Sequence, residues 1–147
     1  EITAILLEGN RKKVYLAEKI FRRTQGPYAF LTFEDQWLTG PQAAFYYRPY
    51  RDPVLRELVR KAFDVVNMGD YGKFDLRRDE AGRYYFIDSN CNPAMGPKEL
   101  DVALGVILDM NGISFYEVLK RLMMNTLRET ADGEELAEES ESVASNQ

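Results

Sequence analysis

Four polar residues of types that suit metal and phosphate chemistry lie in two short segments, Lys73 with Asp75 and Asp88 with Asn90. Within each pair one residue intervenes, and alternate side chains of a β-strand point to the same face. If the two segments pair as a hairpin, Asp75 lies across from or diagonal to Asp88, within about 5–8 Å. Two carboxylates held that close repel each other unless a cation or a proton lies between them. The spacing therefore predicts a cation site; the alternative interpretation is a solvated hairpin face, on which alternating polar residues are ordinary.

The donor types favour a hard cation. Asp75, Asp88 and the side-chain amide of Asn90 offer oxygen ligands, and Mg²⁺ combines a few protein oxygens with water and phosphate oxygens. Lys73 adds a positive charge suited to a phosphate group or a developing oxyanion. These residues predict an open site for a metal and a nucleotide, and not a sealed structural metal.

A hairpin must position these residues, and the surrounding sequence predicts one. Two β-like runs, 71–77 and 83–90, flank a loop in which Gly82 is available for a positive φ. The apolar runs 2–7 and 14–21 predict a second hairpin nearer the start of the chain. The sequence thus predicts two hairpins separated by the middle third of the chain.

Helices are predicted in the remaining segments. One begins at Asp52, because Asp is a preferred N-cap, Pro53 suits the first helical position, and apolar residues recur at three- and four-residue steps. This helix is expected to end near Gly69. The other expectations are an extended stretch at 28–37, a loop through Tyr50, and helices at about 98–110 and 114–128, the last with a capping box from Ser114 to Glu117.

The composition excludes several kinds of chemistry. The chain has no histidine, so it cannot by itself supply a Ser-His-Asp triad, an imidazole base or a His-ligated metal. Its single cysteine, Cys91, cannot form an internal disulfide or a four-cysteine cluster. No apolar run approaches the ~20 residues that span a bilayer. We therefore expect a cytoplasmic protein that does not enter a membrane.

Charge is divided unevenly along the chain. Residues 129–147 contain seven acidic and no basic residues, whereas 1–128 contain 19 basic and 17 acidic residues, a net charge of +2. This balance does not predict a nucleic-acid partner. The clusters Arg11-Lys12-Lys13 and Arg22-Arg23 are interpreted as solvated turn residues, with phosphate contacts as the alternative. The acidic segment has few large apolar groups, so we predict an ordered unit over 1–128 followed by a disordered tail over 129–147.

The hairpin sequence resembles a known signature. Residues 69–77, Gly-Asp-Tyr-Gly-Lys-Phe-Asp-Leu-Arg, and 79–95, with Phe-Ile-Asp-Ser-Asn-Cys-Asn-Pro-Ala-Met at their end, look like the C-terminal signature of ATP-grasp ligases. The likeness is to the D-alanine-D-alanine ligase branch, which has Gly-Arg-x-Asp, a hairpin, then Glu-x-Asn, two residues and Pro-Gly-Met. Weaker likenesses at 33–38, 52–66 and 112–115 occur in the same order, so the resemblance covers essentially 1–128.

The resemblance implies an α+β fold, the ATP-grasp C-terminal subdomain, with a mainly antiparallel sheet and packed helices. The chain opens at Glu1 and not at Met, so this subdomain is expected to be incomplete at its N-terminus, with N-terminal ligase subdomains as the missing partner. The implied reaction activates a carboxylate as an acyl phosphate at the expense of ATP, and an amine then attacks to form a peptide bond. The implied partners are ATP and small-molecule acid and amine substrates. If the upstream half is absent in nature too, apolar residues of the last helix would be exposed and would favour a homodimer.

The resemblance also implies roles for individual residues. Asp75, Asp88 and Asn90 match the ligands of Mg²⁺, for which Mn²⁺ is an alternative. Lys73 stands where the family has a catalytic Arg that stabilises charge at the reacting centre. The remaining matches are Glu1 and Ile87 with nucleotide-binding positions and Ala94 and Glu99 with substrate-binding positions.

Several matched positions carry a different residue from the one usual in the family. Asp88 replaces a Glu, Gln36 replaces a phosphate-contacting Lys, and Ala94 replaces a Gly. Glu99 stands in place of a Ser near the substrate carboxylate. These substitutions leave an alternative function open, a truncated or degenerate ATP-grasp module that binds a nucleotide or a protein partner without ligase chemistry.

Overall fold

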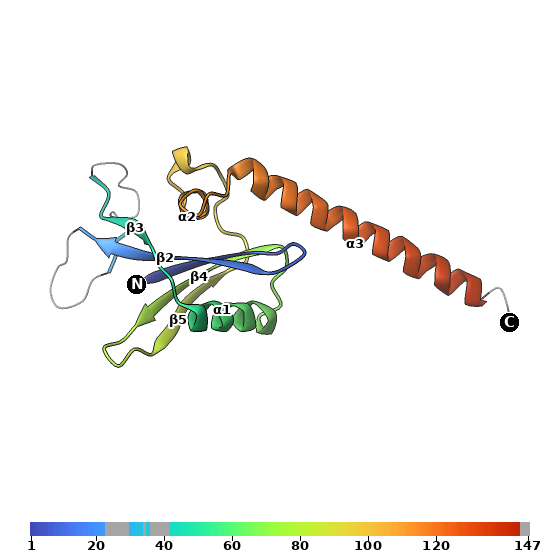
Figure 1. Cartoon of the computed structure of the whole chain (residues 1–147), viewed down its shortest axis with the longest axis horizontal. Coiled ribbons are helices and arrows are strands. Elements are labelled where there is room, and N and C mark those ends of the chain that lie inside the picture. Colours follow the sequence, from blue (N-terminus) through green and yellow to red (C-terminus); the bar gives the residue numbers. More distant parts are fainter. Residues whose placement is uncertain (23–29, 34, 36–41, 145–147) are drawn as a thin grey trace.

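The computed structural model describes residues 1–22, 30–33, 35 and 42–144, and it combines one five-stranded sheet with helices on both sides (Figure 1). The strand order is β3-β2-β1-β4-β5, and every neighbouring pair is antiparallel. This arrangement confirms the predicted α+β class with a mainly antiparallel sheet. The strands are β1 Ile2–Leu7, β2 Lys13–Phe21, β3 Phe45–Pro49, β4 Tyr71–Arg78 and β5 Tyr84–Asn90. The helices are α1 Pro53–Val65, the short 3₁₀ helix η3 Lys98–Leu100, α2 Ala103–Asp109 and α3 Phe115–Ala144.

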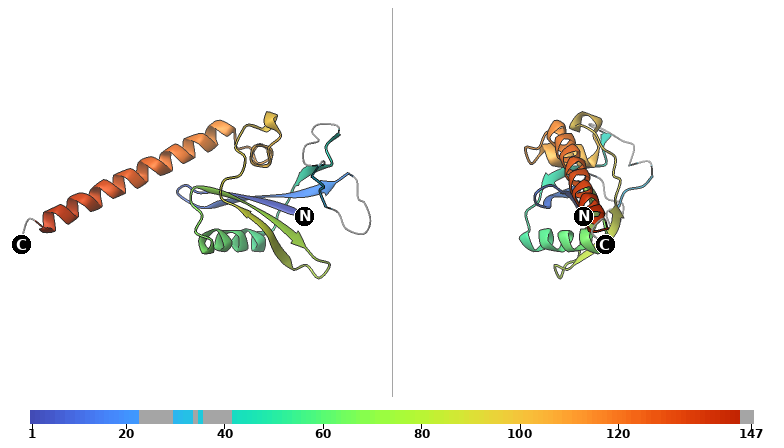
Figure 2. Two further views of the ribbon diagram at one scale, coloured as in Figure 1. Left: turned by 180° about the vertical axis from the view of Figure 1, so that it is seen from behind. Right: turned by 90° about the vertical axis from the view of Figure 1, so that its right-hand side faces the viewer.

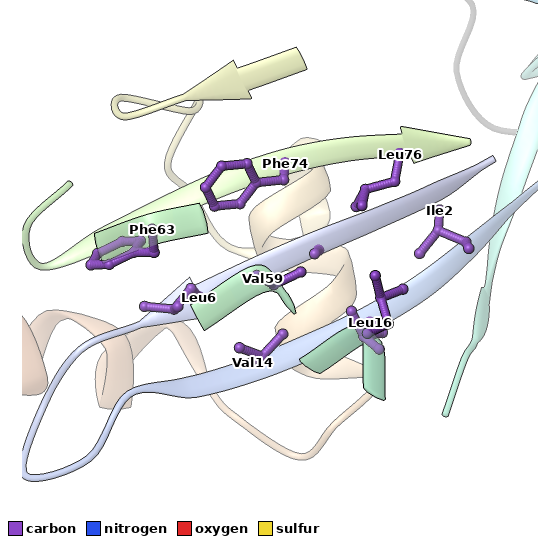
Figure 3. Close-up of a cluster of buried hydrophobic side chains, with 10 residues drawn as sticks. Ile2, Leu6, Val14, Leu16, Val59, Phe63, Phe74 and Leu76 are labelled. Atoms are coloured by element: carbon purple, nitrogen blue, oxygen red, sulfur yellow. The ribbon is translucent and has the colours of Figure 1, made fainter. Parts of the chain in front are cut away.

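Strand β1 lies at the centre of the sheet, and all six of its residues are buried. Alternate side chains serve two separate cores because they point to opposite faces. Ile2, Ala4 and Leu6 belong to the core under α1, whereas Ile5 and Leu7 belong to the core under α2 and the start of α3. Figure 3 shows the first of these cores, with Val59 and Phe63 of α1 lying over the strands.

Helix α1 begins as predicted. The Asp52 carboxylate accepts a hydrogen bond from the Leu55 amide at 3.0 Å, and Pro53 is the first helical residue. The helix ends at Val65, four residues before the predicted end at Gly69. Asn67 adopts a left-handed conformation, with φ of 53°, and this conformation cannot continue an α-helix.

The predicted loop through Tyr50 is wrong, because Phe45–Pro49 forms strand β3 against β2. The segment is rich in aromatic residues, which favour strands, and β3 is an edge strand, where a proline is tolerated. The extended stretch predicted for 28–37 lies largely outside the described residues. Its described members, 30–33 and 35, are not in a strand.

The predicted helix at 98–110 is divided in two. Asp101 has a left-handed φ of 54° and separates η3 from α2. The last helix is capped as predicted, since the Ser114 hydroxyl accepts from the Glu117 amide at 3.2 Å. The Glu117 carboxylate accepts from Arg121 one turn further on, in place of the predicted reciprocal bond.

Helix α3 does not end near residue 128 but continues to Ala144, so the segment predicted to be a disordered tail is helical as far as that residue. Glu and Ala are frequent there, and both have high helix propensity. Figures 1 and 2 show this half of α3 extending away from the sheet. Near its start α3 leaves large apolar side chains exposed, among them Tyr116, Met123 and Leu127. No helix in the described part of the chain is both long enough and apolar enough to cross a bilayer.

Candidate metal and nucleotide site

The hairpin of β4 and β5 has the predicted register. Asp75 lies directly opposite Asp88, and Lys73 lies opposite Asn90. The connecting turn is closed by hydrogen bonds from the Asp79 amide to the Arg83 carbonyl and from the Gly82 amide to the Asp79 carbonyl, both 3.0 Å. The structure therefore brings together the four residues from which the sequence predicted a cation site.

An irregularity in β5 decides which side chains share their face. Asp88 pairs with Asp75, but Phe86 pairs with Leu76, so Ile87 is an extra residue in the ladder. Such a bulge reverses the alternation of side chains along a strand. Asp88 therefore lies on the polar face while Phe86 lies on the α1 face, where its ring packs edge-on against Phe74 with centroids 5.5 Å apart.

A lysine ammonium lies between the two carboxylates. Lys73 Nζ is 2.6 Å from Asp75 Oδ2 and 3.6 Å from Asp88 Oδ2. The other oxygen of Asp75, Oδ1, accepts from the buried hydroxyl of Thr3 at 2.6 Å. The Asp75 side chain is only 14% exposed, whereas that of Asp88 is 55% exposed. The repulsion expected between the two aspartates is thus relieved by the chain's own Lys73.

Asp75 is held in its charged form. Burial raises the pKa of its carboxyl, but hydrogen bonds from Lys73 and Thr3, together with the positive charge of Lys19, more than offset this effect. The net result is a pKa below the usual value of an aspartate. A carboxylate that is largely buried and yet charged near neutral pH is suited to holding a cation.

A second group of charges adjoins the first on the same face. Glu1 forms ion pairs with Lys19 and with Arg77, and both Glu1 and Lys19 are more than nine-tenths buried at their side chains. The Lys19 ammonium also lies 5.1 Å from the centre of the Phe45 ring. Glu1, predicted to contact nucleotide, is therefore anchored beside the hairpin cluster by two cations.

Sequence reasoning missed two buried members of this face, Thr3 and Lys19. The apolar runs predict only that each of them lies in a strand. Both stand at alternate positions of strands whose other residues are mostly apolar, and a polar residue on a buried strand needs a partner. That mismatch was the signal available in the sequence.

The remaining predicted site residues lie in two places. Ile87 lines a hollow of about 360 Å³ with Phe74, Phe86 and Asp88 and with Ala62 and Val66 of α1, so the hollow lies on the α1 side of the hairpin and only Asp88 of the cluster borders it. Ala94 is exposed in the loop after β5, and Glu99 lies in η3, where it lines a different hollow of about 260 Å³ beside α2. Within the described residues, no hydrogen bond or ion pair joins Ala94 or Glu99 to the hairpin cluster, and Gln36 lies outside those residues.

The donor atoms fit an oxygen-seeking divalent cation with few protein ligands. In the described part of the chain no three His, Cys, Asp or Glu side chains come together to hold a metal ion. The cluster instead offers the carboxylates of Asp75 and Asp88 and the amide oxygen of Asn90, which also accepts from the Asn92 amide at 2.9 Å. Mg²⁺ commonly binds proteins through only one or two carboxylates. These residues fit such an ion once the Lys73 ammonium moves away from the carboxylates.

The fold and this cluster together have one characteristic arrangement: the hairpin at the end of an antiparallel sheet presents two aspartates, an asparagine and a lysine on one face. The chain is similar in sequence to D-alanine-D-alanine ligases, which are ATP-grasp enzymes, and this confirms the resemblance predicted above. It is 26% identical to the ligase of Idiomarina loihiensis over 132 residues, which cover 86% of this chain and 39% of the relative. It is 33% identical to the ligase of Burkholderia multivorans and 32% identical to that of Burkholderia vietnamiensis, in each case over 75 residues, 51% of this chain and 23% of the relative. A comparison with known family profiles finds no match. The chain therefore spans well under half the length of these relatives.

Proposed function

We propose that this chain is the metal- and nucleotide-holding portion of an ATP-dependent carboxylate-amine ligase of the ATP-grasp type. One observation carries the proposal: Asp75 and Asp88 face each other across the hairpin with Lys73 between them and Asn90 alongside. The likeness to D-alanine-D-alanine ligases supports the reaction class. An ATP-consuming ligase of this kind would act in the cytoplasm.

Asp75, Asp88 and Asn90 would hold Mg²⁺, or Mn²⁺ in its place. The bound ion would neutralise charge on the phosphates of ATP and so ease transfer of the terminal phosphoryl group. Lys73, released from the two carboxylates, would donate to a phosphate oxygen as a mobile point charge. The pairing of Asp75 with Asp88 and of Lys73 with Asn90 supports a shared role for these four residues on one phosphate chain.

The remaining residues would hold the organic parts of the ligands. Glu1, fixed by Lys19 and Arg77, and Ile87, at the edge of its hollow, would contact the nucleotide. Ala94 and Glu99 would lie toward the acid and amine substrates. In the proposed reaction the substrate carboxylate takes the terminal phosphoryl group of ATP, releasing ADP. The amine then displaces phosphate from the acyl phosphate to give the amide. The other ligase segments would supply the opposite wall of the nucleotide cleft.

One observation favours a second candidate, a non-catalytic module that binds a nucleotide or a protein partner. Both carboxylate oxygens of Asp75 already accept hydrogen bonds from within the chain, from Thr3 and Lys73. A cation would therefore have to displace an existing ion pair. In this candidate the internal pair persists and the cluster serves only to stabilise the hairpin.

Calorimetric titration of the folded chain with ATP in the presence and absence of Mg²⁺ tests the proposal. Heat of binding that requires Mg²⁺ and is lost in both Asp75→Asn and Asp88→Asn is the expected result. Asp64→Asn is the matched control, because it removes the same charge from an exposed position on α1 and should leave binding unchanged. Equal binding by all four proteins, or binding that is indifferent to Mg²⁺, would refute a hairpin metal site.

The two candidates separate in a second step. The chain is joined to the preceding segments of a related D-alanine-D-alanine ligase, and ADP release is measured with candidate acids and amines. Turnover that is lost in Lys73→Met supports the ligase. Nucleotide binding that is indifferent to Mg²⁺ and leads to no turnover supports the non-catalytic module.

A further inference from the structure

A groove of about 570 Å³ lies between the β1–β2 turn and the first half of α3. We call it the basic groove. Arg11 and Lys13 line it from the β1–β2 turn, and four charged residues line it from α3. The helical residues are Glu117, Lys120, Arg121 and Arg128. Five cations against one carboxylate give this small volume a net charge of +4.

The three basic residues in the β1–β2 turn point in different directions. Lys12 pairs with Glu8 and with Asp64 of α1, and its ammonium lies 5.2 Å from the centre of the Phe63 ring. It is therefore occupied on the α1 side of the sheet. Arg11 and Lys13, on either side of it, line the basic groove and are exposed. The basic run is thus not a uniformly solvated turn, since it contributes two of its three charges to one hollow.

Some cations of the basic groove have partners among the described residues, and others do not. Arg121 donates to Glu117 and to the Tyr15 hydroxyl, both at 3.2 Å, and Arg128 donates to Asn10 at 2.7 Å and to Asn125. These contacts fix the two arginines along the wall. The side chains of Arg11, Lys13 and Lys120, in contrast, make no hydrogen bond or ion pair with any described residue. Three cations around one hollow repel one another, and an anion between them would relieve that repulsion.

Hydrogen bonds hold α3, one wall of the basic groove, against the sheet and the β1–β2 turn. Asn125 on α3 is 5% exposed, and its amide nitrogen donates to Asp70, just before β4, at 2.9 Å. Together with the bond from Arg128 to Asn10 in the β1–β2 turn, it ties the helix to the sheet at two points. A groove whose walls are already fixed loses little conformational freedom when a ligand binds.

We propose that the basic groove binds a small anion that carries two or more phosphate groups. Its volume lies within the roughly 300–1,000 Å³ typical of small-ligand sites, which favours a small molecule over the surface of a macromolecule. Arginine and lysine together suit phosphate, because one offers a planar fork and the other a mobile point charge. The side chain of Met124, which also lines the groove, adds an apolar surface for the body of the ligand.

The basic groove is separate from the hairpin cluster, so the proposal does not rest on the proposed ligase function. Lys13 lies opposite Leu7 at one end of β1, whereas Asp75 lies opposite Thr3, four residues back along the same strand. Four residues of a strand span about 13 Å. The acidic half of α3 does not fill the groove of its own chain, because the helix carries it away from the sheet (Figure 2).

The test titrates tripolyphosphate into the full chain in Mg²⁺-free buffer, with affinity from calorimetry and location from amide NMR shifts. We expect shifts at residues 9–13 and 117–128, and an affinity that falls roughly tenfold or more in Lys120→Glu, because a charge-assisted hydrogen bond to phosphate is lost and a repulsion is gained. Arg11→Ser should weaken binding in the same direction. The matched control is Lys61→Glu, an exposed lysine on α1 without a described partner, which should change affinity less than about twofold because distant surface charges are screened.

Three outcomes would overturn the proposal. The first is equal weakening by Lys61→Glu and Lys120→Glu, which would show attraction by overall charge. The second is a set of NMR shifts confined to 71–75 and 88–90, which would place the phosphates at the hairpin cluster. The third is a self-associating chain that takes up tripolyphosphate only after residues 129–147 are removed, which would identify the acidic segment of a second copy as the occupant.

Discussion

The two faces of strand β4 are built on different principles. On one face Gly72, Phe74 and Leu76 are buried beneath α1 in a core of apolar side chains. On the other face Lys73 and Asp75 are mostly buried as charges, each with partners of its own. Apolar burial stabilises the fold directly, whereas a buried ion pair costs desolvation that its attraction offsets only in part. The same strand thus contributes stability on one side and a prepared set of charges on the other.

The largest loss of unfolding free energy is expected when a buried side chain is removed from the α1 core. Phe63 is fully buried and packs beside Gly72, so Phe63→Ala should lower the free energy of unfolding by about 3–5 kcal/mol. Urea denaturation measures the loss. Val65→Ala in the same helix removes a side chain that is 84% exposed, and a change of at most about 0.5 kcal/mol is expected. Similar losses in both variants would mean that α1 does not seal this face.

On the opposite face, the contact of α2 with the loop after β5 depends on a glycine. A Cβ at Gly105 would meet the Gly96 carbonyl oxygen and lie 2.8 Å from the Pro97 carbonyl carbon, which are backbone atoms and cannot turn aside. Gly105→Ala should therefore destabilise the protein by about 1–3 kcal/mol, as overpacking does. Helix propensity alone predicts the opposite sign, a gain of about 1 kcal/mol.

Thermal and urea denaturation of Gly105→Ala decide between these signs. Gly69→Ala is the control, because nothing lies within 4 Å of the position its Cβ would take, and we expect a neutral or slightly stabilising effect. Stabilisation by Gly105→Ala would mean that the loop after β5 is not held against α2.

Sequence patterns predicted much of the arrangement of residues on the polar face of β4 but not all of it. Alternation placed Lys73 with Asp75, and the loop length placed Asp75 opposite Asp88, because both depend only on the local geometry of a hairpin. The bulge at Ile87 was not predictable in this way, since a period-two pattern allows no change of face within a strand. Nor was the contact of Asp75 with Thr3, because these residues meet only through strands that are distant in sequence.

The next smaller effect concerns the cation between the carboxylates. Lys73→Met keeps a side chain of similar length but leaves Asp75 without its main counter-ion. Because the pair is mostly but not fully buried, we expect a loss of about 1–3 kcal/mol in unfolding free energy at neutral pH, between the values for exposed and buried pairs. The measurement is urea denaturation of Lys73→Met, Asp75→Asn and the double variant, since a double-mutant cycle isolates the pair. A coupling free energy near zero would contradict the assignment of Lys73 as the counter-ion.

The same pair predicts the sign of a pH effect. The pKa of Asp75 is lower in the folded protein than in the unfolded chain, where it is about 3.9, so the unfolded state binds the proton more readily. The resulting stabilisation is complete above the unfolded value and is lost as the pH falls through the folded pKa. Asp75→Asn should therefore lose less stability than the wild type between pH 5 and the acid transition. Parallel acid unfolding curves for the two proteins would show that Asp75 does not titrate as its contacts require.

The smallest effect is expected from an aspartate on the α1 side, where a carboxylate serves only local structure. Asp52 caps α1 through the Leu55 amide and also accepts from the Tyr84 hydroxyl, and these hydrogen bonds, that of Tyr84 first, lower the pKa of its carboxyl. Asp52→Ala should cost about 1 kcal/mol, typical of a lost N-cap, whereas Asp52→Asn should cost clearly less because asparagine caps as well as aspartate. At Asp75, in contrast, the negative charge itself is expected to matter, because this carboxylate pairs with the Lys73 ammonium. If Asp52→Asn proved as costly as Asp52→Ala, the Asp52 charge would be essential as well, and the contrast between the two faces would not hold for their aspartates.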